Sequence, residues 1–146
     1  MKKLVVFILI SFLILSCDSD NSVEADGSVK SLSYKSNDCY SDAALSKKNY
    51  EPYFGWNYKK NILYLNCYFQ TLCEAAFTDS VKVEENKIEI FLTYANEDAA
   101  KCVCEYKEDF EFEVTGFDKL EVKLNYKSFQ KESYETLLDQ AIYLNQ

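Results

Sequence analysis

The stretch Leu-Glu-Val-Lys-Leu-Asn-Tyr at residues 120–126 decides the fold class of this chain. Apolar side chains occupy every second position, and charged or amide side chains occupy the positions between them. Successive side chains of a β-strand point to opposite faces of the sheet. The pattern therefore predicts a strand with one buried face and one solvated face.

The same period of two recurs along the chain before residue 120. It covers residues 63–69, 81–84, 88–94 and 102–114, and polar turn residues separate these segments. Short strands at this spacing are typical of antiparallel folds with one face buried. The sequence therefore predicts a mainly β fold, an antiparallel β-sandwich or meander, with residues 29–146 forming a single β-rich domain.

The end of the chain has a different pattern. Apolar side chains in residues 131–144 recur at spacings of three and four, and Ser133 can cap the run. This spacing favours a short amphipathic C-terminal α-helix, and a final strand is the alternative. A turn of helix is a further expectation within residues 40–50.

The first residues have the composition of an export signal. Lys2 and Lys3 precede an apolar run at residues 4–15, and Ser16 and Cys17 follow it. A charged start, an apolar middle and a small residue at the end predict a signal peptide over residues 1–16. The run is too short to be a transmembrane helix, which needs about 20 residues.

The junction Ile-Leu-Ser-Cys at residues 14–17 resembles the lipobox of bacterial lipoproteins. The resemblance implies that a diacylglyceryl group is attached to the Cys17 thiol and that the chain is cut before this residue. Each buried methylene contributes about 0.8 kcal/mol, so two or three acyl chains of palmitate type form a durable membrane anchor. Residues 17–28 are polar and acidic, which predicts a flexible tether.

The overall charge limits the partners of the chain. It has 24 acidic and 16 basic residues and a net charge of −8, which falls to −10 once Lys2 and Lys3 leave with the signal peptide. A surface this acidic repels phosphate backbones, so nucleic acid is not an expected partner. The chain has no histidine, the usual base near neutral pH. We therefore expect no enzymatic activity and no cofactor.

Acidic neighbours give no catalytic pair. They occur at Glu84–Glu85, Glu97–Asp98 and Glu108–Asp109. Adjacent strand residues point to opposite faces, so these pairs do not converge and are expected at solvated edges and turns.

The cysteines predict disulfides, because exported proteins fold in an oxidising environment. Lipidation of Cys17 leaves an odd number, namely Cys39, Cys67, Cys73, Cys102 and Cys104. The strand pattern places Cys67, Cys102 and Cys104 on inward faces. Cys102 and Cys104 would be about 6.5–7 Å apart at Cα, which favours bonds to two different partners. Their spacing fits zinc-site geometry poorly, so we expect no metal.

Two segments resemble the small cysteine-rich lipoproteins of Bacteroidota. They are Asn66-Cys67 and the run with Cys102 and Cys104 before Tyr106. The acidic residues after Cys17 resemble the tag that sends such proteins to the cell surface. The resemblance implies a β-sandwich-like fold in the cell envelope, lipid-anchored to the outer membrane, with no established activity. This chain departs from many relatives in having five residues between Cys67 and Cys73, where theirs are adjacent.

Aromatic side chains provide the binding candidates. The candidate ligand-binding residues are Tyr53, Trp56, Tyr58, Tyr64 and Tyr68. Tyr64 and Tyr68 are predicted on the outward face of their strand, where exposed rings suit sugars or protein hot spots. The alternative is that Phe54 and Trp56 cap the core.

These observations favour a membrane-anchored, non-catalytic binding module for a protein or a glycan. A structural or accessory subunit of an envelope complex is the second hypothesis, with the odd cysteine or the helix at 131–144 docking a partner. An enzyme is the third.

Overall fold

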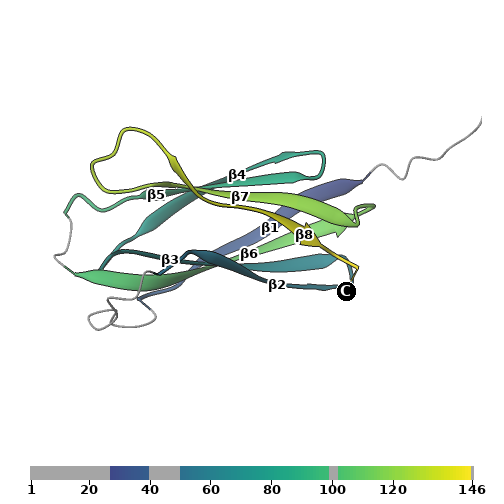
Figure 1. The fold of residues 1–146 in the computed structure, drawn as a ribbon, viewed down its shortest axis with the longest axis horizontal. Helices are drawn as coiled ribbons and strands as arrows, with labels where there is room; N and C mark the ends of the chain where they lie inside the picture. The colour runs from purple at the N-terminus through teal and green to yellow at the C-terminus, as the bar shows by residue number, and fades with distance from the viewer. Residues whose placement is uncertain (1–26, 40–49, 99–101, 146) are drawn as a thin grey trace, which may run out of the picture.

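The computed structural model describes residues 27–39, 50–98 and 102–145. The signal peptide, Cys17, most of the predicted tether and the helical turn expected near residues 40–49 lie outside these ranges. Two four-stranded sheets face each other, which confirms a mainly β sandwich (Figure 1). Within the described ranges the chain forms no helix.

The first sheet has the strand order β1-β6-β3-β2 and is antiparallel throughout. Its strands are β1 (Ser28–Ser36), β6 (Val103–Thr115), β3 (Ile62–Leu72) and β2 (Tyr53–Lys59). The second sheet has the order β4-β5-β7-β8, and its β5–β7 pair is parallel. Its strands are β4 (Phe77–Glu84), β5 (Lys87–Tyr94), β7 (Lys119–Lys127) and β8 (Glu135–Tyr143).

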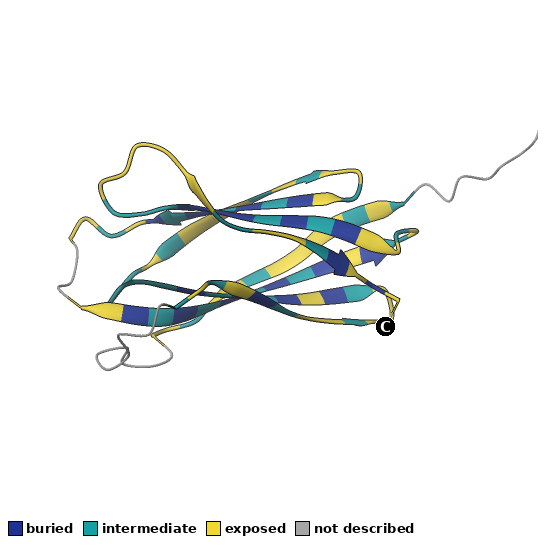
Figure 2. Cartoon of the chain, in the orientation of Figure 1, coloured by how far each residue is buried: buried dark blue, intermediate teal, exposed yellow. Residues whose placement is uncertain are grey.

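The core lies between the two inner faces. In β7, Leu120, Val122 and Leu124 are fully buried, whereas Glu121 and Lys123 are partly exposed. The alternation of buried and exposed residues is visible along the strands (Figure 2). Burial of an aliphatic side chain stabilises the fold by about 1.5–3 kcal/mol. The apolar side chains at every second position therefore supply most of the free energy that packs the two sheets together.

The predicted C-terminal helix is wrong, and the alternative of a final strand is confirmed. Residues Glu135–Tyr143 form β8 and pair with β7, with Leu120 opposite Ile142 and Leu124 opposite Leu138. A helix here would leave the backbone of β7 unpaired at the edge of the second sheet. Pairing satisfies those groups and also buries Ile142, and this tertiary gain outweighs the helical spacing of the apolar residues.

Candidate ligand-binding face

The five aromatic candidates lie on opposite faces of the first sheet. Tyr53 of β2 is opposite Tyr68 of β3, and both belong to the outer face together with Tyr64. Trp56 is opposite Leu65, a fully buried core residue, so Trp56 and Tyr58 belong to the inner side of β2. The structure therefore places Tyr53, Tyr64 and Tyr68 on one face, with Tyr53 and Tyr68 in contact, and separates them from the other two.

A tyrosine stack is the main feature of the outer face. The rings of Tyr53 and Tyr68 are nearly parallel, with centroids 4.5 Å apart and an angle of 9°. Gly55 lies beside the stack, and a Cβ at this position would make an ordinary contact of 3.4 Å with Cε2 of Tyr68. Tyr53 and Tyr64 are 47% and 42% exposed, so both rings can contact a ligand.

Tyr50 extends this stack at one end. Its ring centroid lies 6.5 Å from that of Tyr53, and its hydroxyl donates a 2.8 Å hydrogen bond to Glu105 of β6. Burial, and then this hydrogen bond, raise the pKa of Tyr50 above its ordinary value. The hydroxyl therefore stays protonated and holds the ring against the sheet.

A polar cluster lies beside the tyrosines, centred on Asp109 of β6. Its carboxylate accepts hydrogen bonds from Asn66 at 2.6 Å and Asn37 at 3.0 Å, and Lys107 lies 3.1 Å away. Burial raises the pKa of Asp109, but these three partners outweigh it and hold the pKa below its usual value. The carboxylate is therefore charged and fixed in orientation at neutral pH.

The outer face thus combines exposed flat rings with fixed amide and carboxylate groups. The rings offer apolar faces of the size of a sugar ring, and the polar groups offer hydrogen bonds at defined positions. Such a face can bind a ligand with alternating apolar and hydroxyl surfaces without any covalent chemistry.

Trp56 and Tyr58 have other surroundings. Trp56 is 37% exposed at a hollow of about 130 Å³, which Asn57, Tyr58, Tyr143 and Leu144 also line. The Tyr58 hydroxyl donates a 3.0 Å hydrogen bond to the carbonyl of Val114, which fixes the end of β2 to β6. Phe54 is buried in the core, in agreement with the alternative that it caps the core. Trp56 lies at the rim of the core and is partly exposed.

The disulfides follow the expected pattern of two separate partners for Cys102 and Cys104. Cys39 bonds to Cys104 and Cys73 bonds to Cys102, with Cα separations of 5.8 Å and 5.4 Å. Cys102 lies just before β6 and is exposed, so its predicted inward position is wrong. The strand begins only at Val103, because the bond to Cys73 holds Cys102 at the sheet end.

Cys67 is the free cysteine of the described residues, and it is fully buried. Burial, and then the charges of Glu108 and Asp109, raise the pKa of its thiol well above the usual value. A neutral buried thiol is a poor nucleophile. Among the residues described, no cluster of His, Cys, Asp and Glu could hold a metal ion.

Glu108 is a further residue that sequence reasoning placed wrongly. It was expected to be solvated beside Asp109, but its side chain is fully buried in the first sheet. Its carboxylate accepts hydrogen bonds from Tyr34 at 2.7 Å and Ser36 at 3.2 Å, both on β1. Burial raises the pKa of Glu108 to about 7. Its shared parity with Tyr106 and Phe110 was the signal for an inward position.

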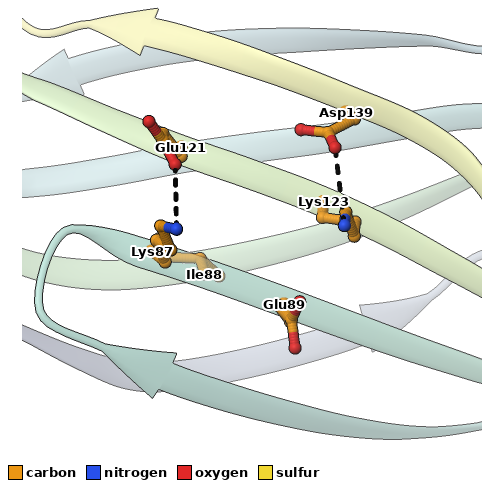
Figure 3. Close-up of a pocket in the computed structure, with 6 residues that line it drawn as sticks. All are labelled: Lys87, Ile88, Glu89, Glu121, Lys123 and Asp139. Carbon is orange, nitrogen blue, oxygen red and sulfur yellow. Dashed lines mark ion pairs between the residues drawn. The ribbon is translucent and has the colours of Figure 1, made fainter.

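The outer face of the second sheet also has a hollow of about 130 Å³, but most of the side chains that line it are charged, and four of them form ion pairs (Figure 3). Lys87 pairs with Glu121 at 3.4 Å, and Lys123 pairs with Asp139 at 3.5 Å. These charges compensate each other across neighbouring strands, which is typical of a solvated sheet face. This hollow is therefore a weaker candidate for ligand binding than the outer face of the first sheet.

Comparison with known proteins does not assign this chain to a family. No protein-family model, no curated protein and no solved structure matches this chain. In the part of the chain that the structure describes, no helix is long and apolar enough to cross a membrane. The two disulfides indicate an exported protein, because such bonds persist outside the reducing cytosol.

Proposed function

We propose that this chain is an exported lipoprotein that binds a neutral glycan on the outer face of its first sheet and has no catalytic role. The observation that carries the proposal is the stacked pair Tyr53–Tyr68 beside the fixed polar cluster of Asn66 and Asp109. Tyrosine rings pack against the apolar faces of sugar rings, and the amide and carboxylate groups bond to sugar hydroxyls.

The charge of this face favours a neutral glycan over an anionic one. Glu105, Asp109, Glu111 and Glu113 all belong to the outer face of β6, which runs beside the tyrosines. A sulfated or uronic acid chain would bring its own negative charges close to these carboxylates. A neutral sugar avoids this repulsion and can still accept and donate hydrogen bonds.

The anchor is part of the same proposal. The lipobox-like residues 14–17 support lipidation of Cys17, and the acidic residues after it support a tether that holds the domain away from an outer membrane. A glycan-binding domain at the end of such a tether would sample polysaccharides close to the cell.

The accessory-subunit hypothesis loses the two features on which it depended. The odd cysteine of the described residues is Cys67, which is buried and cannot dock a partner. The segment expected to dock as a helix is the edge strand β8. We therefore favour the glycan-binding module.

Binding of defined sugars to the full chain, purified in mild detergent, tests the proposal. The probes are neutral hexasaccharides of glucose, mannose, xylose and N-acetylglucosamine, with a uronic acid hexasaccharide for comparison. We expect at least one neutral probe to bind by calorimetry. The double variant Tyr53→Ala, Tyr64→Ala should weaken it by about tenfold or more, since each ring contributes up to about 1.5 kcal/mol.

Tyr143→Ala is the matched control, because Tyr143 is an exposed tyrosine of the second sheet. It should bind the sugar as the unmodified chain does. The proposal is wrong if none of the neutral probes binds, or if the double variant binds as tightly as the control.

A further inference from the structure

Gly55 interrupts the row of outward side chains on β2. Tyr53 precedes it and Asn57 follows it on the same outer face, and Gly55 itself has no side chain. The three atoms nearest to a Cβ at this position belong to β3. They are Cε2 of Tyr68 at 3.4 Å, and Cβ and Oδ1 of Asn66 at 3.9 Å. The space above Gly55 is therefore bordered by the tyrosine stack and by the amide of Asn66.

Asn66 presents an oriented oxygen to this space. Its Nδ2 donates the 2.6 Å hydrogen bond to Asp109 of β6, whereas its Oδ1 lies on the side of Gly55, because β3 runs between β6 and β2. Among the described residues, no donor bonds to this oxygen. It is therefore an acceptor of fixed position for a hydroxyl or N–H group of a ligand that lies over Gly55.

Tyr64 is a second aromatic position on the same face. Tyr64, Asn66 and Tyr68 are alternate residues of β3, so all three point outward and Asn66 lies midway. The rise of a strand places the Cα atoms of Tyr64 and Tyr68 roughly 13 Å apart. Tyr64 is 42% exposed and lies between Asn57 and Glu111 in the register of the sheet. The outer face of β3 thus carries two separate aromatic positions with a hydrogen-bonding position between them.

We propose that the outer face binds an extended, linear segment of a neutral polysaccharide along β3, with one sugar unit over Gly55 between the tyrosine stack and Tyr64. This inference rests on the glycan binding proposed above and adds the length and direction of the ligand. The distance of roughly 13 Å corresponds to about three sugar units, so the end units contact the rings and the middle unit bonds to Asn66. A free monosaccharide or disaccharide cannot occupy all three positions.

The polar groups favour a path along β3 over a path across the strands. Across the strands, the row from Gly55 leads through Asn66 to Asp109, whose carboxylate is already bonded by Asn37 and Lys107. That row offers no second ring. Along β3, both ends of the path have an aromatic side chain that can pack against a sugar.

Calorimetry with sugars of increasing length tests this binding mode on the full chain in mild detergent. The probes are the disaccharide, tetrasaccharide and hexasaccharide of glucose, mannose, xylose and N-acetylglucosamine. For the sugar that binds, the tetrasaccharide should bind about tenfold tighter than the disaccharide, because only the longer chain reaches both aromatic positions. The hexasaccharide should bind within about twofold of the tetrasaccharide, because its further units meet no additional ring.

Two variants separate the middle position from the end position. In Tyr64→Ala the tetrasaccharide should bind within about twofold of the disaccharide, because the second aromatic position is lost. Gly55→Val should weaken tetrasaccharide binding by about tenfold or more, because the new side chain stands where the middle sugar lies. The strand accepts this change, since the added Cβ makes an ordinary contact of 3.4 Å and valine suits a strand. Ser80→Val is the matched control at an exposed position of the edge strand β4, and it should bind as the unmodified chain does.

The outcomes distinguish this binding mode from glycan binding itself. If no neutral sugar of any length binds, both the proposed function and this mode are wrong. If sugars bind but the disaccharide and the tetrasaccharide bind equally tightly, glycan binding stands and the extended mode is wrong. The same conclusion follows if Tyr64→Ala keeps the full gain with length, or if Gly55→Val binds as tightly as Ser80→Val.

Discussion

Glu108 joins β1 to the rest of the domain through a buried carboxyl group. Tyr34 and Ser36 of β1 both donate hydrogen bonds to it, so the first strand of the domain is fixed by a polar contact inside the sandwich. Burial favours the neutral form and raises the pKa of Glu108 to about 7, compared with 4.5 for a free side chain. The native protein therefore binds this proton more tightly than the unfolded chain does.

The first prediction concerns the pH dependence of stability. Because the folded pKa of Glu108 is raised, the free energy of unfolding should fall as pH rises from about 4.5 to about 7. The loss should not exceed about 3.4 kcal/mol, the free energy that corresponds to this difference in pKa. Glu108→Gln should remove this slope, as measured by denaturant unfolding at a series of pH values.

Glu113→Gln is the control for this prediction, because Glu113 is an exposed residue of the same strand. It should keep the slope of the unmodified protein. If Glu108→Gln keeps that slope as well, then Glu108 is not the group whose protonation stabilises the fold.

The sequence predicted the positions of single side chains correctly where strand alternation alone decides which face they occupy. The inward positions of Leu63, Leu65 and Cys67 follow from the period of two alone. Glu108 was misplaced because its charge was taken to indicate solvent exposure, although its parity matched the core. The separation of Trp56 from Tyr64 could not be foreseen without the β2–β3 register, because the pairing of two strands depends on the turn between them.

At the level of elements, the strands were predictable and their order was not. Residues 88–94 and 120–126 have the alternation of half-buried strands, and both lie in strands. Nothing local indicates that β5 and β7 are parallel neighbours, because their contact depends on β6 passing through the other sheet. The wrong prediction of a helix at residues 131–144 has a similar cause. This segment forms β8 because it pairs with the edge of β7, a contact that its own sequence does not indicate.

The two disulfides link different strands and close loops of different length. Cys39 and Cys104 are 65 residues apart, and Cys73 and Cys102 are 29 apart. In the loop-entropy model each bond stabilises the fold by about 4 kcal/mol, and the longer loop contributes about 0.7 kcal/mol more. Both bonds fix the same end of β6, so each also helps to position the polar cluster around Asp109.

The second prediction concerns the contribution of each disulfide to stability and compares two double variants, each of which lacks one of the bonds. Cys39→Ser, Cys104→Ser should lower the free energy of unfolding slightly more than Cys73→Ser, Cys102→Ser, because it releases the longer loop. Denaturant unfolding of both variants under the same conditions measures the difference. A larger loss from the 29-residue loop would show that local packing, and not loop closure, sets the contribution of these bonds.

At the scale of the whole molecule, the two outer faces differ in chemistry. The second sheet presents compensated ion pairs such as Lys87–Glu121 (Figure 3). The first presents exposed tyrosines beside fixed polar groups. The second sheet also carries an aromatic pair, Phe91 and the exposed Tyr134, but we assign ligand binding to the first sheet, where the stacked tyrosines lie beside the fixed polar cluster.

Chemical-shift mapping by NMR tests the central claim most directly. The isotopically labelled full chain in mild detergent is titrated with the neutral hexasaccharide that binds it best. We expect the largest shifts on Tyr53, Tyr68 and Asn66 on the outer face of the first sheet, while the signals of Lys87 and Lys123 of the second sheet stay unchanged. Shifts centred on Trp56 and Tyr143 at the sandwich edge, or on the second sheet, would contradict it.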